Sequence, residues 1–449
     1  MSAGPHRGYG VYTGLYVVVA SMVGAGILTS SGYTLRETGN PWSLLGLWAV
    51  GGAMALAGAL TVAEMATMLP RVGGDYLFAR EAFGRGAGVV VGWATFVLGF
   101  AAPTAVIARL AAKYLLGEIA GPWQGLAEPA LAVALIAACA LAHALGRKES
   151  ARAQALTTLA KLVVLIGMAL VGFLSGGGDW GHFNRGGWPA QAEWPALAGS
   201  LVYVGYAYAG WNAAAYLAGE MREPVRMVPR ALVGGCLLVA ALYLALNVLY
   251  IYAIDPQAFA TMPMDDVGRV AELAMTTLCG PGIGRGLSLV LGIGLVASVS
   301  AYLMSGSRVL AAMAADGAFF PMAGNWHASR GTPVGGVICL GGTACLLACS
   351  GSFLQLLDYT STGLTAVSAL VVAAIFPLRR RMSSAAGFRV PLFPLPPLLV
   401  LGLSAWTIAA VLMQPDKRFP ALLSLGTIAA GIPLAGWWGR KESIHVTNG

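Results

Sequence analysis

The chain has 449 residues, of which 57% are hydrophobic and only 10% are charged, and its mean hydropathy is +0.73. Soluble domains carry about 25% charged residues, so this composition excludes an ordinary water-soluble globule. The net charge of +8 comes from basic residues in separate short loops, and we therefore expect no nucleic-acid partner.

Apolar stretches of about 20 residues recur along the chain, and each is long enough to cross a ~30 Å hydrocarbon core as a helix. No basic segment with a short apolar stretch and a cleavage site precedes the first span, which we expect to be retained. The predicted fold is an all-α polytopic membrane protein with twelve spans, at residues 11–32, 42–69, 87–112, 128–145, 155–175, 196–218, 230–253, 285–314, 334–350, 353–377, 391–412 and 420–438.

The connecting segments differ in charge. With the N-terminus placed inside, 18 Lys and Arg residues fall on the inner side and 7 on the outer side. Basic residues accumulate in cytoplasmic loops of membrane proteins. We therefore expect a multi-pass protein with both termini in the cytoplasm. The lipid bilayer around it is expected to be a bacterial plasma (inner) membrane.

The first span is interrupted by small and polar residues in SMVGAGILTSSG, residues 21–32. Glycine in a helix interior costs about 1 kcal/mol relative to alanine. The sixth span is interrupted in a similar way in YVGYAYAGWNAAAY, residues 203–216. Close helix packing also explains membrane glycines, and GGAMALAG at residues 51–58 is typical of a packing face.

Two glycine-interrupted spans in matching positions of two halves indicate a transporter with inverted repeats and a site at the membrane midplane. We predict one transporter domain over residues 1–449. Its first repeat covers residues 11–175, its second repeat covers residues 196–377, and two added spans lie within residues 391–438.

The two interruptions suit a zwitterion. Unwinding of residues 21–27 would free N–H groups at the start of a half-helix, where they attract a carboxylate. Carbonyl groups near residues 203–208 would then receive an ammonium group. An α-amino acid fits this arrangement, and the predicted substrate-binding residues are Ser21, Gly24, Ala25, Gly26, Ile27, Tyr203, Tyr206, Ala207, Tyr208, Gly210, Trp211 and Asn212.

Four motifs resemble the amino acid-polyamine-organocation (APC) superfamily, and within it the L-type amino acid transporters (LAT) and their bacterial relatives. They are VGAGILTSSG (23–32), AEMATMLPRVGGDYLFAREAFG (63–84), YAGWNAAAYLAGEMREPVRMVPRAL (208–232) and SGSRVLAAMAADGAFFP (305–321). The resemblance implies ten core helices plus two, with alternating access.

The same resemblance assigns roles to residues of both breaks. It places the substrate carboxylate on the N–H groups of Ala25, Gly26 and Ile27, and an aromatic gate at Tyr206. Relatives often carry Gly-Ser-Gly or Gly-Thr-Gly where this chain has Gly-Ala-Gly at residues 24–26, so a side-chain hydroxyl is missing here. For Tyr206 the alternative is packing between helices, with its hydroxyl group bonded to a neighbour.

Lys161 lies seven residues into the fifth span, about 10 Å deep at 1.5 Å per residue. A charged group there is costly and marks a functional hypothesis, although a lysine can also extend toward the interface. The resemblance implies that this lysine replaces a bound sodium ion and tethers span five to span one. Lys161 is the candidate coupling residue, with exchange, proton symport and uniport left open and sodium coupling disfavoured.

Charged residues cluster at the inner ends of spans two and six. Ion pairs between the two clusters would close the cytoplasmic pathway, whereas exposed charges that only solvate a loop contribute about 0–1 kcal/mol. Arg222 and Glu223 belong to the second cluster. The predicted gating residues are Tyr206, Glu64, Arg71, Asp75, Glu220 and Arg226.

The six cysteines are not clustered and the five histidines are scattered, so we expect no disulfide framework, no metal site and no cofactor. The resemblance implies that L-type transporters join a heavy subunit through a cysteine in the loop after span three. The corresponding loop, LLGEIAGPWQGLAEP at residues 115–129, has no cysteine. We therefore expect no disulfide-linked heavy subunit.

We predict a secondary active transporter for neutral L-amino acids that works by alternating access, as an exchanger or a proton-linked carrier. We expect no acidic residue to lie beside either break, with Asp358 in span ten as the nearest. A cationic amino acid or polyamine transporter is the alternative. The spans lack a nucleophile–base pair or a metal motif, which argues against an enzyme. A receptor, a sensor or a channel is the rival from another class.

Overall fold

The computed structural model describes residues 9–71, 73–117, 121–145, 151–185, 194–326, 332–382 and 387–440. Within these ranges the chain is helical apart from loops and two isolated β-bridges. The first ten helices are α1 (Val11–Met22), α2 (Ala25–Thr38), α3 (Pro41–Met68), α4 (Gly74–Phe83), α5 (Arg85–Ala94), α6 (Ala102–Leu116), α7 (Gln124–Ala144), α8 (Ala151–Leu174), α9 (Trp194–Ala207) and α10 (Pro224–Ala253).

The second half continues in the same way. Its helices are α11 (Met264–Val267), α12 (Val270–Cys279), α13 (Pro281–Ala315), α14 (Val334–Ala348), α15 (Phe353–Ala373), α16 (Ile375–Arg381), α17 (Leu395–Met413), α18 (Pro415–Ala429) and α19 (Gly431–Arg440). Two further segments matter below: a π-helix, η1 (Thr95–Ala101), and a 3-10 helix, η5 (Ala213–Glu220).

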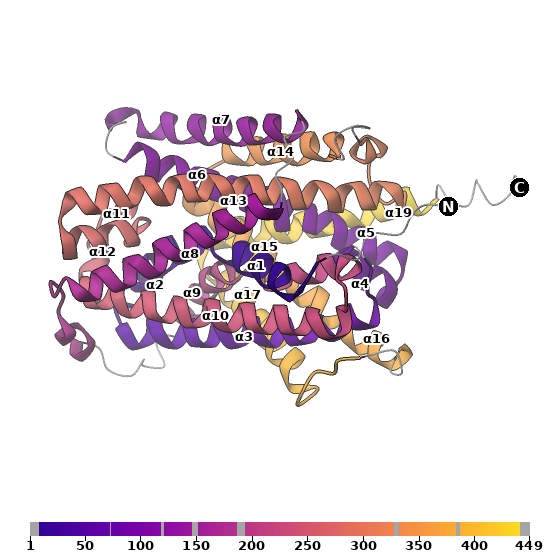
Figure 1. Cartoon of the computed structure of the whole chain (residues 1–449), viewed down its shortest axis with the longest axis horizontal. Helices are drawn as coiled ribbons and strands as arrows, with labels where there is room; N and C mark the ends of the chain where they lie inside the picture. Colours follow the sequence, from indigo (N-terminus) through magenta and orange to yellow (C-terminus); the bar gives the residue numbers. More distant parts are fainter. Residues whose placement is uncertain are drawn as a thin grey trace, which may run out of the picture.

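Most helices run along the long axis of the molecule (Figure 1). The helices α3 and α10 pack side by side along one edge, and α7 and α14 pack along the opposite edge. In the same view α1, α2 and α9 lie between α13 and α10, and most residues of α2 and α9 are buried. Longer helices therefore flank the two interrupted spans.

In the described residues, nine helices are long and apolar enough to cross a membrane, and the α1–α2 pair makes ten if it counts as one bent span. The prediction of a polytopic all-α membrane protein is confirmed. Two predicted spans have a different form: residues 196–218 comprise α9, a turn and η5, and in residues 334–350 the 15-residue helix α14 ends at Ala348. The residues before Tyr9 and after Arg440, which include both termini, lie outside the described ranges.

Small residues on α3 position the second break, as the packing interpretation of residues 51–58 predicts. A Cβ atom on Gly58 would lie 2.9 Å from the Trp211 indole ring, and one on Gly51 would lie 2.5 Å from Val204. The hydroxyl group of Tyr208 donates a hydrogen bond to the Trp48 carbonyl at 3.1 Å. The glycines of α3 therefore let the side chains of Val204, Tyr208 and Trp211 in the sixth span approach closely.

Glu64 anchors the segment that follows α16. Its fully buried carboxylate accepts a hydrogen bond from the Val390 N–H at 2.6 Å and pairs with Arg379 Nε at 3.2 Å. The Arg379 guanidinium also lies 3.9 Å from the centroid of the Phe393 ring. The contacts of Glu64 are therefore those of a structural anchor between α3, α16 and the chain before α17.

We expect Glu64→Ala to destabilise the protein strongly. Removing one partner of a buried ion pair leaves the other charge uncompensated, which costs about 3–5 kcal/mol. Thermal unfolding of the detergent-solubilised protein measures the effect. Glu81→Ala is the matched control, because the Arg71–Glu81 pair is exposed and such pairs contribute about 0–1 kcal/mol. Equal unfolding temperatures for the two variants would contradict the anchoring role.

Candidate functional site

The first break is short. Helix α1 ends at Met22 and α2 begins at Ala25, and the two helices are bent by 41° at Val23 and Gly24. The predicted unwinding of residues 21–27 is therefore too long, because Ser21 and residues 25–27 keep helical geometry.

The start of α2 offers unbonded donors. The first N–H groups of a helix have no partner inside it, and within the described residues no side chain caps α2. Ala25 is 2% exposed and Ile27 is fully buried, so these N–H groups face the protein interior. A buried helix N-terminus of this kind attracts an anionic group.

The second break is longer and touches the first. Helix α9 ends at Ala207, a turn follows, and η5 begins at Ala213. Gly210 has a φ of +98°, and a Cβ atom there would lie 2.7 Å from the Ser21 backbone. A Cβ atom on Gly26 would lie 2.2 Å from the Cα atom of Ala207. The predicted residues of both breaks are thus brought together, and glycine at two positions permits the contact.

Two tyrosines of neighbouring spans bind the carbonyl groups at the breaks. The hydroxyl group of Tyr243 in α10 lies 2.7 Å from the Met22 carbonyl and 3.2 Å from the Ala207 carbonyl. Tyr302 in α13 donates to the Ser21 carbonyl at 3.4 Å. Sequence reasoning missed both residues, although a tyrosine hydroxyl inside an apolar span signals a need for a buried partner.

These contacts correct the prediction that the second break leaves free carbonyl groups near residues 203–208 for an ammonium group. The Tyr203 carbonyl accepts a hydrogen bond from Ser30 Oγ at 3.0 Å. The Ala207 carbonyl accepts one from Tyr243. Other side chains of the protein therefore take some of the hydrogen bonds that the sequence analysis assigned to the substrate.

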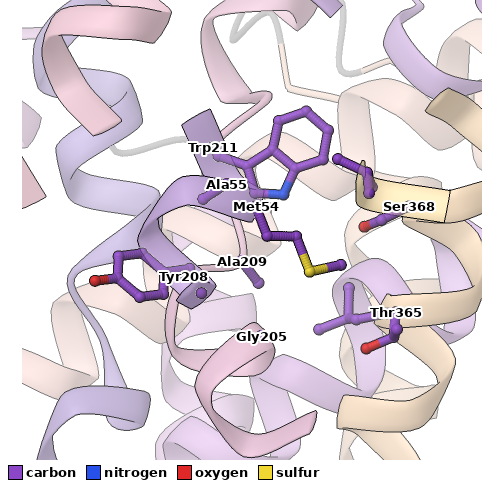
Figure 2. Close-up of a pocket in the computed structure, with 11 residues that line it drawn as sticks. Met54, Ala55, Gly205, Tyr208, Ala209, Trp211, Thr365 and Ser368 are labelled. Atoms are coloured by element: carbon purple, nitrogen blue, oxygen red, sulfur yellow. The ribbon is translucent and has the colours of Figure 1, made fainter. Parts of the chain in front are cut away.

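A cavity of about 30 Å³ lies beside the second break, enough for about one water molecule. Figure 2 shows Tyr208, Ala209 and Trp211 on one side of it and Thr365 of α15 on the other, with Met54 of α3 reaching between them. Ser368 of α15 also lines it, whereas the buried side chain of Tyr206 is not part of its lining.

Lys161 is half-buried in α8, and its ammonium group donates to Ser298 Oγ of α13 at 2.5 Å. The expected tether to span one is therefore replaced by a bond to span eight. Ser298 lies one helical turn before Tyr302, which contacts the Ser21 carbonyl. Lys161 thus reaches the first break indirectly, through two side chains on one face of α13.

The predicted gating charges do not pair across spans two and six. Glu64 pairs with Arg379, Arg71 with Glu81 and Arg226 with its neighbour Glu223. The carbonyl group of Glu220 accepts a hydrogen bond from the Tyr9 N–H at 3.2 Å. The charged groups of Glu64, Arg71 and Arg226 therefore each have a nearer partner than the opposite cluster.

Asp75 provides the contact that does join the two regions. Its carboxylate accepts hydrogen bonds from Asn212 Nδ2 at 3.0 Å and from the Tyr216 hydroxyl at 2.8 Å. An acidic group therefore lies beside the second break, contrary to the prediction from sequence, because the fold brings α4 against η5. Burial of this residue, which lies outside the membrane-spanning segments, raises the pKa of its carboxyl group to about 6, while both hydrogen bonds act to lower it.

Two broken helices that meet inside a bundle of membrane-length helices are typical of secondary transporters. The family model for amino acid permeases matches residues 10–426, and the chain belongs to this family. The protein is thus a polytopic membrane transporter of amino acids and is not an enzyme. The resemblance drawn from the four motifs is confirmed.

Individual relatives cover different shares of the chain. The serine/threonine exchanger SteT of Bacillus subtilis is 25% identical over 96% of this chain and 96% of its own length. The mouse Asc-type amino acid transporter 1 is 25% identical over 81% of this chain and 70% of its own. The mouse b(0,+)-type amino acid transporter 1 is 28% identical over 55% of this chain and 51% of its own.

Proposed function

We propose that this protein exchanges neutral L-amino acids across a bacterial plasma membrane, with the substrate carboxylate bound to the N–H groups of Ala25, Gly26 and Ile27. The observation that carries this proposal is the uncapped, buried start of α2, in direct contact with the second break. The full-length similarity to an exchanger named for serine and threonine supports the choice of exchange and of neutral substrates.

The proposal includes the complete architecture predicted from the sequence. Twelve spans form two inverted repeats, residues 11–175 and 196–377, with two added spans in residues 391–438 and both termini in the cytoplasm. The breaks at α1–α2 and α9–η5 support the repeats, since each interrupts the first span of its half. The loop without cysteine after span three supports a protein that works without a disulfide-linked subunit.

Residues near the breaks are proposed to select the side chain and control access. Tyr206 serves as the aromatic gate, and Tyr208 with Trp211 lines the side-chain region next to the cavity of Figure 2. The hydroxyl groups of Thr365 and Ser368 at this cavity suit small polar side chains. The carboxylates of Asp75 and Asp358 favour a second candidate function, transport of cationic amino acids. Both carboxylates already accept hydrogen bonds, however: Asp358 from the Tyr203 hydroxyl group at 2.6 Å and Asp75 from Asn212.

Exchange in proteoliposomes tests substrate and mechanism together. Vesicles loaded with labelled serine are placed in external solutions that each hold one amino acid, with and without a pH gradient. Efflux that requires external serine, threonine or alanine supports neutral exchange, and saturation with concentration distinguishes a carrier from a channel. Stimulation by arginine or a polyamine, with none by neutral amino acids, would overturn the proposal. Efflux into empty solution would indicate uniport.

Asp75 is proposed to hold the inner end closed. It joins α4, which lies between two membrane spans, to Asn212 at the second break. Arg80 of the same helix pairs with Asp316, at the end of α13, at 2.7 Å. A movement of the second break is therefore passed to α4 through Asn212, and the buried carboxylate makes this contact sensitive to pH.

We expect exchange to slow as the internal pH falls through about 6. The pKa of Asp75 is about 6 in the buried arrangement and 3.8 in water. Between these values the closed arrangement binds a proton more readily than an opened, hydrated one, so a falling pH stabilises the closed arrangement. Exchange rates at fixed external pH measure the effect. Asp75→Asn should lose the dependence, and Asp316→Asn, which changes an exposed carboxylate at the same end, should keep it. An unchanged profile in Asp75→Asn would refute the role.

A further inference from the structure

A buried charged cluster lies at the end of the bundle where α2 ends and α9, α15 and α18 begin. Under the proposed orientation this is the outer end, so the inference below rests on the proposed function. The cluster comprises Glu37, Ser200, Tyr203, Asp358 and Lys417. Of these residues, only Tyr203 is among the predicted substrate-binding residues, and its backbone carbonyl accepts a hydrogen bond from Ser30 Oγ.

The contacts within the cluster join four helices. Lys417 of α18 forms an ion pair with Glu37 of α2, and Ser200 of α9 donates to the same carboxylate at 2.5 Å. The Lys417 ammonium lies 4.8 Å from the centroid of the Tyr203 ring. The hydroxyl group of Tyr203 in turn donates to Asp358 of α15.

Lys417 is the centre of this cluster. Its side chain is only 5% exposed, which is unusual for lysine, and it interacts with both half-helices: with α2 through Glu37 and with α9 through the face of Tyr203. An ammonium over an aromatic ring and beside a carboxylate is attracted by both groups. One residue from an added span therefore holds the outer parts of both broken spans.

The same end of the bundle is closed in this structure by contacts with α2. Arg36 donates to the Met262 carbonyl group. A Cβ atom on Gly32 would lie 2.0 Å from the Val267 carbonyl oxygen of α11. For substrate to enter from this side, α2 and α9 must move away from α11, α15 and α18, and the Lys417 contacts must then break or rearrange.

We propose that Lys417 is a positioning residue that sets how often the transporter opens to the outside, by holding α2 and α9 in the outwardly closed arrangement. The residue acts through Glu37 and Tyr203 and does not touch the substrate. Weakening the Lys417 contacts raises the population that is open to the outside. The apparent affinity for external substrate then rises and that for internal substrate falls, because each scales with the fraction of the competent state.

The first test compares external and internal KM in exchange assays on oriented proteoliposomes. Lys417→Met together with Glu37→Gln removes both charges of the ion pair, and we expect the ratio of external to internal KM to fall about fivefold or more. Lys417→Arg keeps the charge and should preserve the ratio. A purely structural role would lower the amount of folded protein without shifting this ratio, and an unshifted ratio in the double variant would overturn the proposal.

The second test needs no substrate, which separates a failure of this proposal from a failure of the proposed function. Thr34 of α2 is fully buried and its hydroxyl group has no hydrogen-bond partner, so Thr34→Cys is a mild reporter of outer opening. A membrane-impermeant thiol reagent is added outside, and labelling above that of the native cysteines is measured. Faster labelling in the Lys417→Met, Glu37→Gln background supports the proposal. Equal labelling rates contradict it, whatever the substrate proves to be.

Discussion

Gly26→Ala is expected to lower transport by about 100-fold, the size of effect that a displacement of about 1 Å produces in a positioned site. The new methyl carbon would lie 2.2 Å from the Cα atom and 2.5 Å from the Cβ atom of Ala207. These atoms cannot rotate away, so the two breaks must separate. Initial rates of amino acid exchange in proteoliposomes, normalised to monodisperse protein, measure the loss.

Gly24→Ala is the matched control for this prediction. It adds the same methyl group two residues earlier in the chain, where no atom lies within 4 Å, and its φ of −146° is outside the positive range that favours glycine. We expect it to retain most of the wild-type rate. Wild-type transport in Gly26→Ala would show that contact between the two breaks is unnecessary. Equal losses in both variants would show that the effect is one of helix propensity at the break.

Lys161→Ala is expected to reduce or uncouple transport while the protein stays folded. The substitution removes the ammonium group that bonds to Ser298 of α13, on the helix face that carries Tyr302. Coupling between sites typically amounts to about 1–3 kcal/mol, so we expect a loss of about 5- to 150-fold in exchange or in its response to a pH gradient. Uptake kinetics with and without that gradient provide the measurement.

Ser298→Ala separates the hydrogen bond from the charge. It removes the acceptor and leaves the ammonium group in place, so we expect a smaller loss than in Lys161→Ala. Size-exclusion profiles of both variants check that the fold persists. If Lys161→Ala transports with unchanged kinetics and unchanged pH dependence, Lys161 has no part in coupling.

Much of the architecture was predictable because the membrane imposes simple rules. In hydrocarbon, a helix must satisfy the hydrogen bonds of its own backbone. The length of the apolar stretches and the glycines that interrupt them were therefore sufficient to find most spans and both breaks. The glycines at residues 26 and 210 marked places where backbones meet, and the structure shows that contact. The extent of unwinding was not predictable, since it depends on how closely the second break packs against the first.

The partners of polar side chains were harder to predict. Charge pairs were expected between the inner ends of spans two and six, yet Glu64 is bonded to Arg379 and the Val390 N–H, which follow 315 and 326 positions later. Tyr243 and Tyr302 reach the breaks from spans seven and eight. Such long-range bonds depend on side-chain direction within a packed bundle, which hydropathy does not encode.

The strand-like bridge at the N-terminal end of α1 has a mechanical consequence. The Tyr9 N–H bonds to the Glu220 carbonyl and the Tyr9 carbonyl accepts from the Arg222 N–H at 3.1 Å, which fastens the entrance of the first span to the exit of the sixth. Together with the glycine contacts near the middle of both spans, this bridge connects the first and sixth spans at two points. The inner segments of the two spans, α1 and η5, are therefore expected to tilt together, because a tilt of one alone would break the bridge.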